Sequence, residues 1–140
     1  PNDLQLSALF AMGLTADRRW LPILNDEMQS PSADFRAEAA RAAGGLGSAD
    51  SVDALQGLLT DQDLEVAIAA VYALGQIGGD RAVELLTRLS ENPDYEELYD
   101  AIDEALEEAD LLEGGFDLLA LDEDGLEGDD DGLLDDLRAN

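Results

Sequence analysis

Apolar and small residues recur at helical spacing in three ten-residue segments, which are residues 4–13, 35–44 and 66–75. In the third segment, Val66, Ala70 and Ala73 fall on one face of a helix. No stretch shows the alternation of apolar and polar residues that half-buried strands have. The pattern therefore predicts an all-α protein.

The three segments align without gaps at an offset of 31 residues. Each ends in a glycine, and these glycines are Gly13, Gly44 and Gly75. The offset continues into a second helix of each unit, where the matching residues are Leu24, Leu55 and Leu86. A repeat that holds through two helices predicts tandem hairpins, which bury their apolar faces by stacking. We name the first helix of each hairpin the A helix and the second the B helix.

A fourth A helix is predicted at an offset of 32, with Leu98, Ile102 and Ala105 on its apolar face. Its B helix is expected near Phe116. The units are then 1–30, 31–61, 62–92 and 93–121, and stacking should bury Leu55, Leu74 and Leu86 almost fully.

Residues between the helices suggest where helices begin. Asp50 and Asp80 are expected to cap B helices by accepting hydrogen bonds from unpaired amides. Pro31 and Pro93 are expected in the first turns of A helices, where proline costs no hydrogen bond.

Repeats two and three share further residues: Phe35-Arg36, Ala39-Ala40 and Leu46-Gly47, then Val66, Ala69-Ala70, Ala73-Leu74-Gly75, Ile77-Gly78 and Asp80-Arg81-Ala82-Val83. With this pattern the chain resembles HEAT-repeat proteins, in the short form also found in phycobilisome lyases. The resemblance implies a right-handed α-α superhelix, a solenoid of about four hairpins over residues 1–110. The family often has an arginine after the opening apolar residue. Here only Arg36 keeps it, so a polar bridge between helices from this position is possible only for Arg36.

The resemblance also implies that B helices line the concave surface of the array. Polar residues off their apolar stripe would then face a protein partner, and these are Asn25, Gln29, Asp53, Gln56, Glu84, Thr87 and Arg88. The alternative is that they are simply solvated.

A second candidate surface lies on the A helices. Phe10, Arg41 and Tyr72 occupy equivalent positions and could form a row suited to cation–π contact. Alternatively, they pack between repeats while Arg41 extends to water.

The composition argues against catalysis. The chain has no Cys and no His, and all seven basic residues are Arg. Thiolate, imidazole and lysine chemistry are therefore excluded, and no cofactor or metal site is expected. A non-catalytic scaffold for protein–protein interaction is the favoured function. The alternative is a bilin lyase or an accessory subunit, for which Arg18 and Arg19 are the only adjacent basic pair.

The net charge of −27 is concentrated at one end of the chain. Residues 1–90 hold 13 acidic and six basic residues, a net of −7, whereas residues 91–140 hold 21 acidic residues and one Arg, a net of −20. Such a chain repels nucleic-acid phosphates and anionic membranes, so neither is expected as a partner. With no apolar stretch of membrane-spanning length, a cytoplasmic location is the default expectation.

Residues 122–140 form an acidic segment that contains leucines. The run from Glu127 to Asp131 resembles part of a Ca²⁺-binding EF-hand loop, but Arg138 stands where the loop needs a bidentate carboxylate. Docking through Leu133, Leu134 and Leu137 is one interpretation, and a solvated tail is the other.

The predicted first A helix is apolar on nearly every side, with Gln5 and Ser7 as its polar residues between Leu4 and Met12. An exposed apolar patch usually marks a contact. Leu6 and Phe10 are therefore assigned to an interface at the N-terminal edge. A homodimer, or an earlier repeat of a longer protein, would cover it, and the start at Pro1 favours a fragment. Tolerated exposure of a fraying terminal helix is the alternative.

Overall fold

The computed structural model describes residues 2–113, and every regular element in that range is helical. The predicted all-α class is therefore confirmed for these residues. The chain divides into two compact units, Pro1–Asp110 and Leu111–Asn140, and the array described below belongs to the first. The fourth B helix expected near Phe116 and the acidic segment 122–140 lie outside the described residues.

The described helices follow the predicted order of hairpins. The A helices are α1 (Asn2–Leu14), α3 (Ala33–Leu46), α5 (Leu64–Ile77) and a helix at residues 99–113 that follows the 3-10 segment η3 (Pro93–Leu98). The B helices are α2 (Leu21–Glu27), α4 (Val52–Leu58) and α6 (Gly79–Ser90). Short 3-10 turns precede the first two of these, η1 (Arg18–Trp20) and η2 (Ala49–Ser51).

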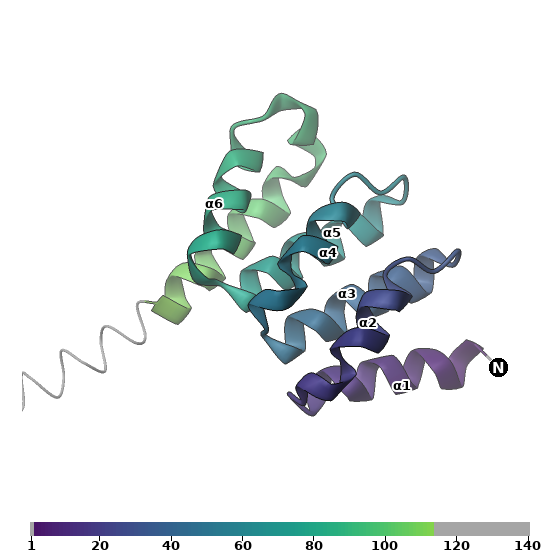
Figure 1. The fold of residues 1–140 in the computed structure, drawn as a ribbon. Coiled ribbons are helices and arrows are strands. Elements are labelled where there is room, and N and C mark those ends of the chain that lie inside the picture. The colour runs from purple at the N-terminus through teal and green to yellow at the C-terminus, as the bar shows by residue number, and fades with distance from the viewer. Residues whose placement is uncertain (1, 114–140) are drawn as a thin grey trace, which may run out of the picture. The chain divides into compact units, whose positions relative to one another are not determined.

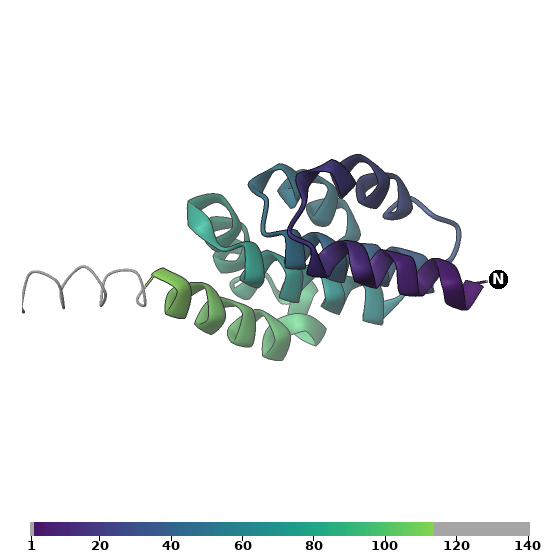
Figure 2. The same ribbon diagram turned by 90° about the horizontal axis from the view of Figure 1, so that it is seen from below.

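The A helices lie side by side in one layer, and the B helices cover that layer (Figure 1). Figure 2 shows the two layers from below, with α1 and the helix at 99–113 at opposite ends of the A layer. Helix α3 contacts both α1 and α5, while α2 packs on α3 and α4 packs on α5. Each of these B helices thus bridges to the A helix of the next repeat, which is how stacked hairpins share one core.

The core lies between the two layers. Leu55 of α4, Leu74 of α5 and Leu86 of α6 are fully shielded from solvent, as the repeat pattern predicts. Burying one such side chain contributes about 1.5–3 kcal/mol, so this layer boundary supplies much of the stability.

The helix starts differ in part from expectation. Pro93 stands in the first turn of η3, after the cap Asn92, and not in that of the helix at 99–113, while Pro31 precedes the cap Ser32 of α3. The caps expected at Asp50 and Asp80 are wrong. The second B helix begins with a 3-10 turn that moves its cap back to Ser48. In the third, Gly78 occupies the cap position with φ 63° and offers no side chain, which leaves Asp80 in the first turn.

The glycines of the repeat allow the A helices to approach one another closely. A methyl group placed on Gly13 would lie 2.7 Å from the Cα of Ala42 in α3. On Gly75 it would lie 2.8 Å from the Cα of Ala105. Such distances are shorter than real carbon–carbon contacts, so only glycine fits unless the helices move apart. Gly44 faces Ala73 in the same way. One glycine–alanine contact therefore recurs at every junction of described A helices.

Substituting these glycines should reveal the constraint. We expect Gly75→Ala to lower the free energy of unfolding by about 1–3 kcal/mol, because the added methyl forces α5 and the helix at 99–113 apart. Gly57→Ala in α4 is the matched control, since nothing lies near its added methyl. It should raise stability by about 0.4–1 kcal/mol through helix propensity. Urea titration checks both, and equal effects would contradict close packing as the reason for Gly75.

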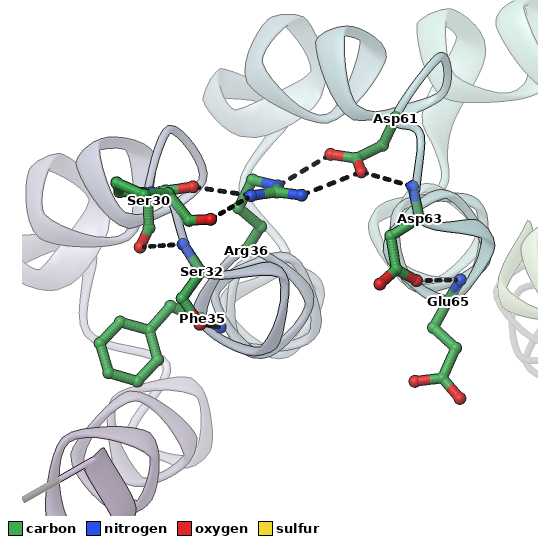
Figure 3. A network of polar contacts seen from close by, with 8 residues as sticks. Ser30, Ser32, Phe35, Arg36, Asp61, Asp63 and Glu65 are labelled. Carbon is green, nitrogen blue, oxygen red and sulfur yellow. Dashed lines mark hydrogen bonds and ion pairs between the residues drawn. The ribbon is translucent and has the colours of Figure 1, made fainter.

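Arg36 connects two loops of the array (Figure 3). Its Nε donates to Asp61 Oδ2 at 2.9 Å and its Nη2 to Asp61 Oδ1 at 3.1 Å, while Nη1 donates to the carbonyl of Ser30 at 2.8 Å. The loop that precedes α3 is thus tied to the loop that precedes α5. The one arginine for which the sequence allows a polar bridge thus makes one, and it joins loops rather than two helices.

The bridge shifts the protonation of Asp61. Burial raises the pKa of this carboxyl group, but hydrogen bonds from Arg36 and from the amide of Asp63 outweigh burial and hold the pKa below its usual value. The carboxylate is therefore stabilised in the folded state. Because the folded pKa lies below the unfolded one, the bridge stabilises the fold above about pH 4, and this contribution is lost as pH falls through the folded value.

We expect Asp61→Asn to lower the free energy of unfolding by about 1–3 kcal/mol at neutral pH, because it weakens charge-assisted hydrogen bonds in a half-buried site. The difference from wild type should shrink as the pH falls below about 4 and through the lowered folded pKa of Asp61, because wild-type Asp61 then becomes protonated as well. Urea titrations of both proteins at about pH 7 and about pH 3 measure this difference in the free energy of unfolding. Asp53→Asn, in an exposed pair with Arg81, is the control and should change stability by less than about 0.5 kcal/mol. A pH-independent difference would contradict the protonation argument.

Candidate functional site

A groove of about 660 Å³ runs across the A-helix layer from α1 over α3 to α5. We call it the A-helix groove. Three helices contribute its lining, which consists of Phe10, Gly13, Leu14, Glu38, Arg41, Ala42, Gly45, Glu65, Ile68, Ala69, Tyr72, Ala73 and Gln76. Phe10, Arg41 and Tyr72, whose equivalent positions suggested a row, all line this one groove.

The groove follows from the size of the side chains. Ala42 and Gly45 of α3 are too small to fill the space between α1 and α5, whereas Phe10 and Tyr72 are large and stand on the two outer helices. Gly45 also lies against the backbone of Gly13, where a methyl group would be 2.6 Å from the Gly13 carbonyl oxygen. The small residues that let A helices approach thus also leave a hollow on their outer side.

The walls of the groove carry exposed apolar side chains. Leu14 is 72% exposed and Phe10 is 57% exposed, both on α1. Tyr72 on α5 is 36% exposed. Large apolar groups left in water at the rim of a concave surface are typical of a binding site.

The charged groups of the groove are partly neutralised within the protein. Arg41 Nη1 lies 3.2 Å from Glu38 Oε2, one turn away on the same helix. The Tyr72 hydroxyl donates to Glu104 Oε2 at 2.5 Å, across to the next A helix. This hydrogen bond, followed by burial and the negative charges of Glu104 and Asp100, raises the pKa of Tyr72. Tyr72 is therefore a neutral hydrogen-bonded phenol at physiological pH.

The family model for HEAT repeats matches residues 20–107, which spans the described array from the start of α2 into the helix at 99–113. The chain belongs to the HEAT-repeat family. Comparison with curated proteins finds no match to the chain.

The match to HEAT repeats starts after α1, so the first A helix of the array lies outside it. That helix nevertheless keeps the 31-residue register, because Gly13 meets Ala42 as Gly44 meets Ala73. The contacts of α1 therefore place it in the HEAT array, although the family match does not include it.

The residues proposed for a B-helix face fall into two groups. Asp53, Gln56, Glu84, Thr87 and Arg88 lie on α4 and α6, where Gln56, Glu84 and Arg88 line a shallow hollow of about 220 Å³. Arg88 pairs with Glu84 at 2.6 Å, Asp53 pairs with Arg81, and Thr87 donates to the carbonyl of Val83. Asn25 is half-buried on α2, and Gln29 is exposed beyond its end. Among these residues only Glu84 and Arg88 bind each other, and the assignment of the set to a partner stays a prediction.

The residues predicted for the N-terminal edge are on α1. Leu6 is half-buried, and Phe10 faces the A-helix groove. Leu4, at 68%, is more exposed than either. The tail-docking residues Leu133, Leu134 and Leu137 lie outside the described residues, as does the partial EF-hand pattern.

Two further observations apply to the described part of the HEAT chain. No helix within residues 2–113 is long and apolar enough to cross a membrane. In the same range, no three acidic side chains come together in a way that could hold a metal ion.

The floor of the A-helix groove was not predicted from the sequence. Ala42, Gly45 and Gln76 were not among the expected site residues, although the pair Gly44-Gly45 was visible. One of these glycines meets the helix on each side of α3, since Gly45 lies against α1 and Gly44 lies against α5. A double glycine at the end of a predicted helix was the signal that could have located the groove.

We expect Glu104→Gln to move the pKa of Tyr72 toward its usual value, because the variant removes the negative charge that opposes ionisation. The measurement is the rise of tyrosinate absorbance with pH, with the curve of Tyr72→Phe subtracted to cancel the other tyrosines. Glu107→Gln, exposed on the same helix, is the control and should leave the titration unchanged. An unchanged pKa in Glu104→Gln would contradict the contact.

Proposed function

We propose that this chain is a non-catalytic protein–protein interaction module and that a segment of a partner protein binds in the A-helix groove. The observation that carries this proposal is the pairing of a 660 Å³ groove with exposed Phe10, Leu14 and Tyr72 on its walls. Aromatic anchors beside a concave apolar floor are the usual core of protein recognition sites. HEAT repeats commonly mediate such interactions, which supports the same conclusion.

The negative charge of the molecule favours a partner segment that carries positive charge. Glu65 lines the groove, and Glu104 stands at the Tyr72 end. The whole chain has a net charge of −27. A segment that presents apolar side chains to the floor and Lys or Arg to the rim complements this surface. We therefore propose an amphipathic basic helix as the occupant, and neither nucleic acid nor an anionic membrane.

A chromophore-handling function is less well supported. The propionate groups of a bilin need free cations, but five of the six arginines within residues 2–113 are paired with carboxylates: Arg19, Arg36, Arg41, Arg81 and Arg88. We therefore propose that the likeness to phycobilisome-lyase repeats concerns the helical architecture and not a chromophore-handling function. The right-handed turn of the array and a cytoplasmic location are part of the same proposal.

The groove can be tested with a defined probe. A labelled helical peptide of leucine and lysine heptads should bind the full chain, and fluorescence anisotropy gives the dissociation constant. Replacing both Phe10 and Tyr72 with Ser should weaken binding by about tenfold or more, because aromatic anchors dominate such interfaces. The same peptide with glutamate in place of lysine should bind far more weakly.

A control separates groove binding from general charge attraction. Ile23→Ser removes an exposed apolar side chain from α2, in the other layer, and leaves every charge in place. It should not alter the dissociation constant. If the Phe10/Tyr72 variant binds the lysine peptide as tightly as wild type does, attraction to the acidic chain explains the binding and the proposed function is wrong.

A further inference from the structure

The outer face of α1 is the side turned away from α3. Three of its residues, Leu4, Ala8 and Ala11, are exposed. In the later A helices the equivalent residues are mostly buried. Ala11 corresponds to Ala42, Ala73 and Ala105, which are 4%, 1% and 0% exposed. We call Leu4, Ala8 and Ala11 the outer face of α1.

The same comparison holds for the other two positions. The equivalents of Ala8 are Ala39, Ala70 and Ile102, all fully shielded. Those of Leu4 are Val66 and Leu98, which are 0% and 3% exposed, and Phe35, which is half-buried. The outer face of α1 therefore has the composition of a buried surface, and it carries no charged side chain.

The contact partner of the Ala11 position is known from the rest of the array. Ala42 receives Gly13, Ala73 receives Gly44, and Ala105 receives Gly75, in each case from the preceding A helix. Ala11 presents the same receiving position with no preceding helix in the described residues. The surface that receives a glycine on the later A helices is thus also present on α1, but no helix within the described residues contacts it there.

We propose that the outer face of α1 is the docking surface for the A helix of a further HEAT-type repeat on its N-terminal side, and that this helix places a glycine against Ala11. The surface is separate from the A-helix groove, and the proposal does not rest on the function assigned to that groove.

A second copy of the described chain does not fit this surface equally well. Its A-helix glycines Gly13, Gly44 and Gly75 already face the next helix. At the equivalent place the helix at 99–113 carries Glu107, which is exposed. A carboxylate there prevents the close approach that glycine allows and would be desolvated in the contact. A further A helix can therefore approach α1 closely, whereas Glu107 prevents the same close approach to the helix of residues 99–113.

The proposal can be tested by adding the missing neighbour. A second copy of residues 31–62, fused directly before Pro1, keeps the 31-residue register and brings its own copy of Gly44 opposite Ala11. Hydrogen exchange of the added repeat is the readout. If it docks, exchange of its A-helix amides should be slowed by about tenfold or more relative to the same chain with Ala11→Leu, because the larger side chain blocks the contact.

Two controls make the result specific. Ala11→Leu in the 140-residue chain should leave its stability nearly unchanged, because Ala11 is exposed there. Phe10→Ser in the extended chain should leave the protection intact, since its equivalents Arg41 and Tyr72 stay exposed in later helices. Phe10→Ser thus affects the groove and not the stacking, so failure of one proposal is distinguishable from failure of the other.

Either of two outcomes would overturn the inference. One is rapid exchange of the added repeat with Ala11 in place. The other is self-association of the 140-residue chain, measured by sedimentation velocity, that Ala11→Leu abolishes, because the occupant would then be a second copy.

Discussion

The close contact of a glycine in one A helix with an alanine in the next is the constraint on which this structure depends. It recurs between α1 and α3, between α3 and α5, and between α5 and the helix at 99–113. Because the contact leaves no room for a side chain, it fixes both the distance and the register of neighbouring A helices. The leucines of the B helices then fill the space that this spacing creates, and Arg36 joins the loops at one end of the same junction. The groove on the other side of the layer is a product of the same small residues.

The part of the fold that could be predicted is the part set by periodicity. The 31-residue offset placed Gly13, Gly44 and Gly75 in equivalent positions, and these positions make equivalent contacts. The burial of Leu74 followed from its place on the apolar face. The bridge from Arg36 followed from a single position in the repeat. Such features depend on the spacing of residues along the chain, which can be read from the sequence without a structure.

The remaining features depend on geometry that spacing does not specify. Ser48 and Asp50 lie two residues apart, and both are residue types that often cap helices. Ser48 is the cap because a 3-10 turn precedes α4, and neither residue type predicts that turn. One candidate site was expected on the B helices and another in the row of Phe10, Arg41 and Tyr72 on the A helices, and that row lines the A-helix groove. The floor of this groove arises from the small size of Ala42 and Gly45, and the sequence indicates such a missing volume only indirectly, through the pair Gly44-Gly45. The pairing of Arg41 with Glu38 likewise depends on rotamers.

Helix α1 has a place in both proposed surfaces, with Phe10 and Leu14 on a wall of the groove and Ala11 on its outer face. Within residues 2–113, α1 has a neighbouring A helix on one side only, so it should fray at a lower free energy than α3, which lies between two A helices. Each fraying event removes one wall of the groove. A repeat stacked on the outer face would restrain α1 and thereby raise the fraction of molecules whose groove is complete. Occupancy of one surface would then favour occupancy of the other, a positive cooperativity that needs no movement beyond the folding of a single helix.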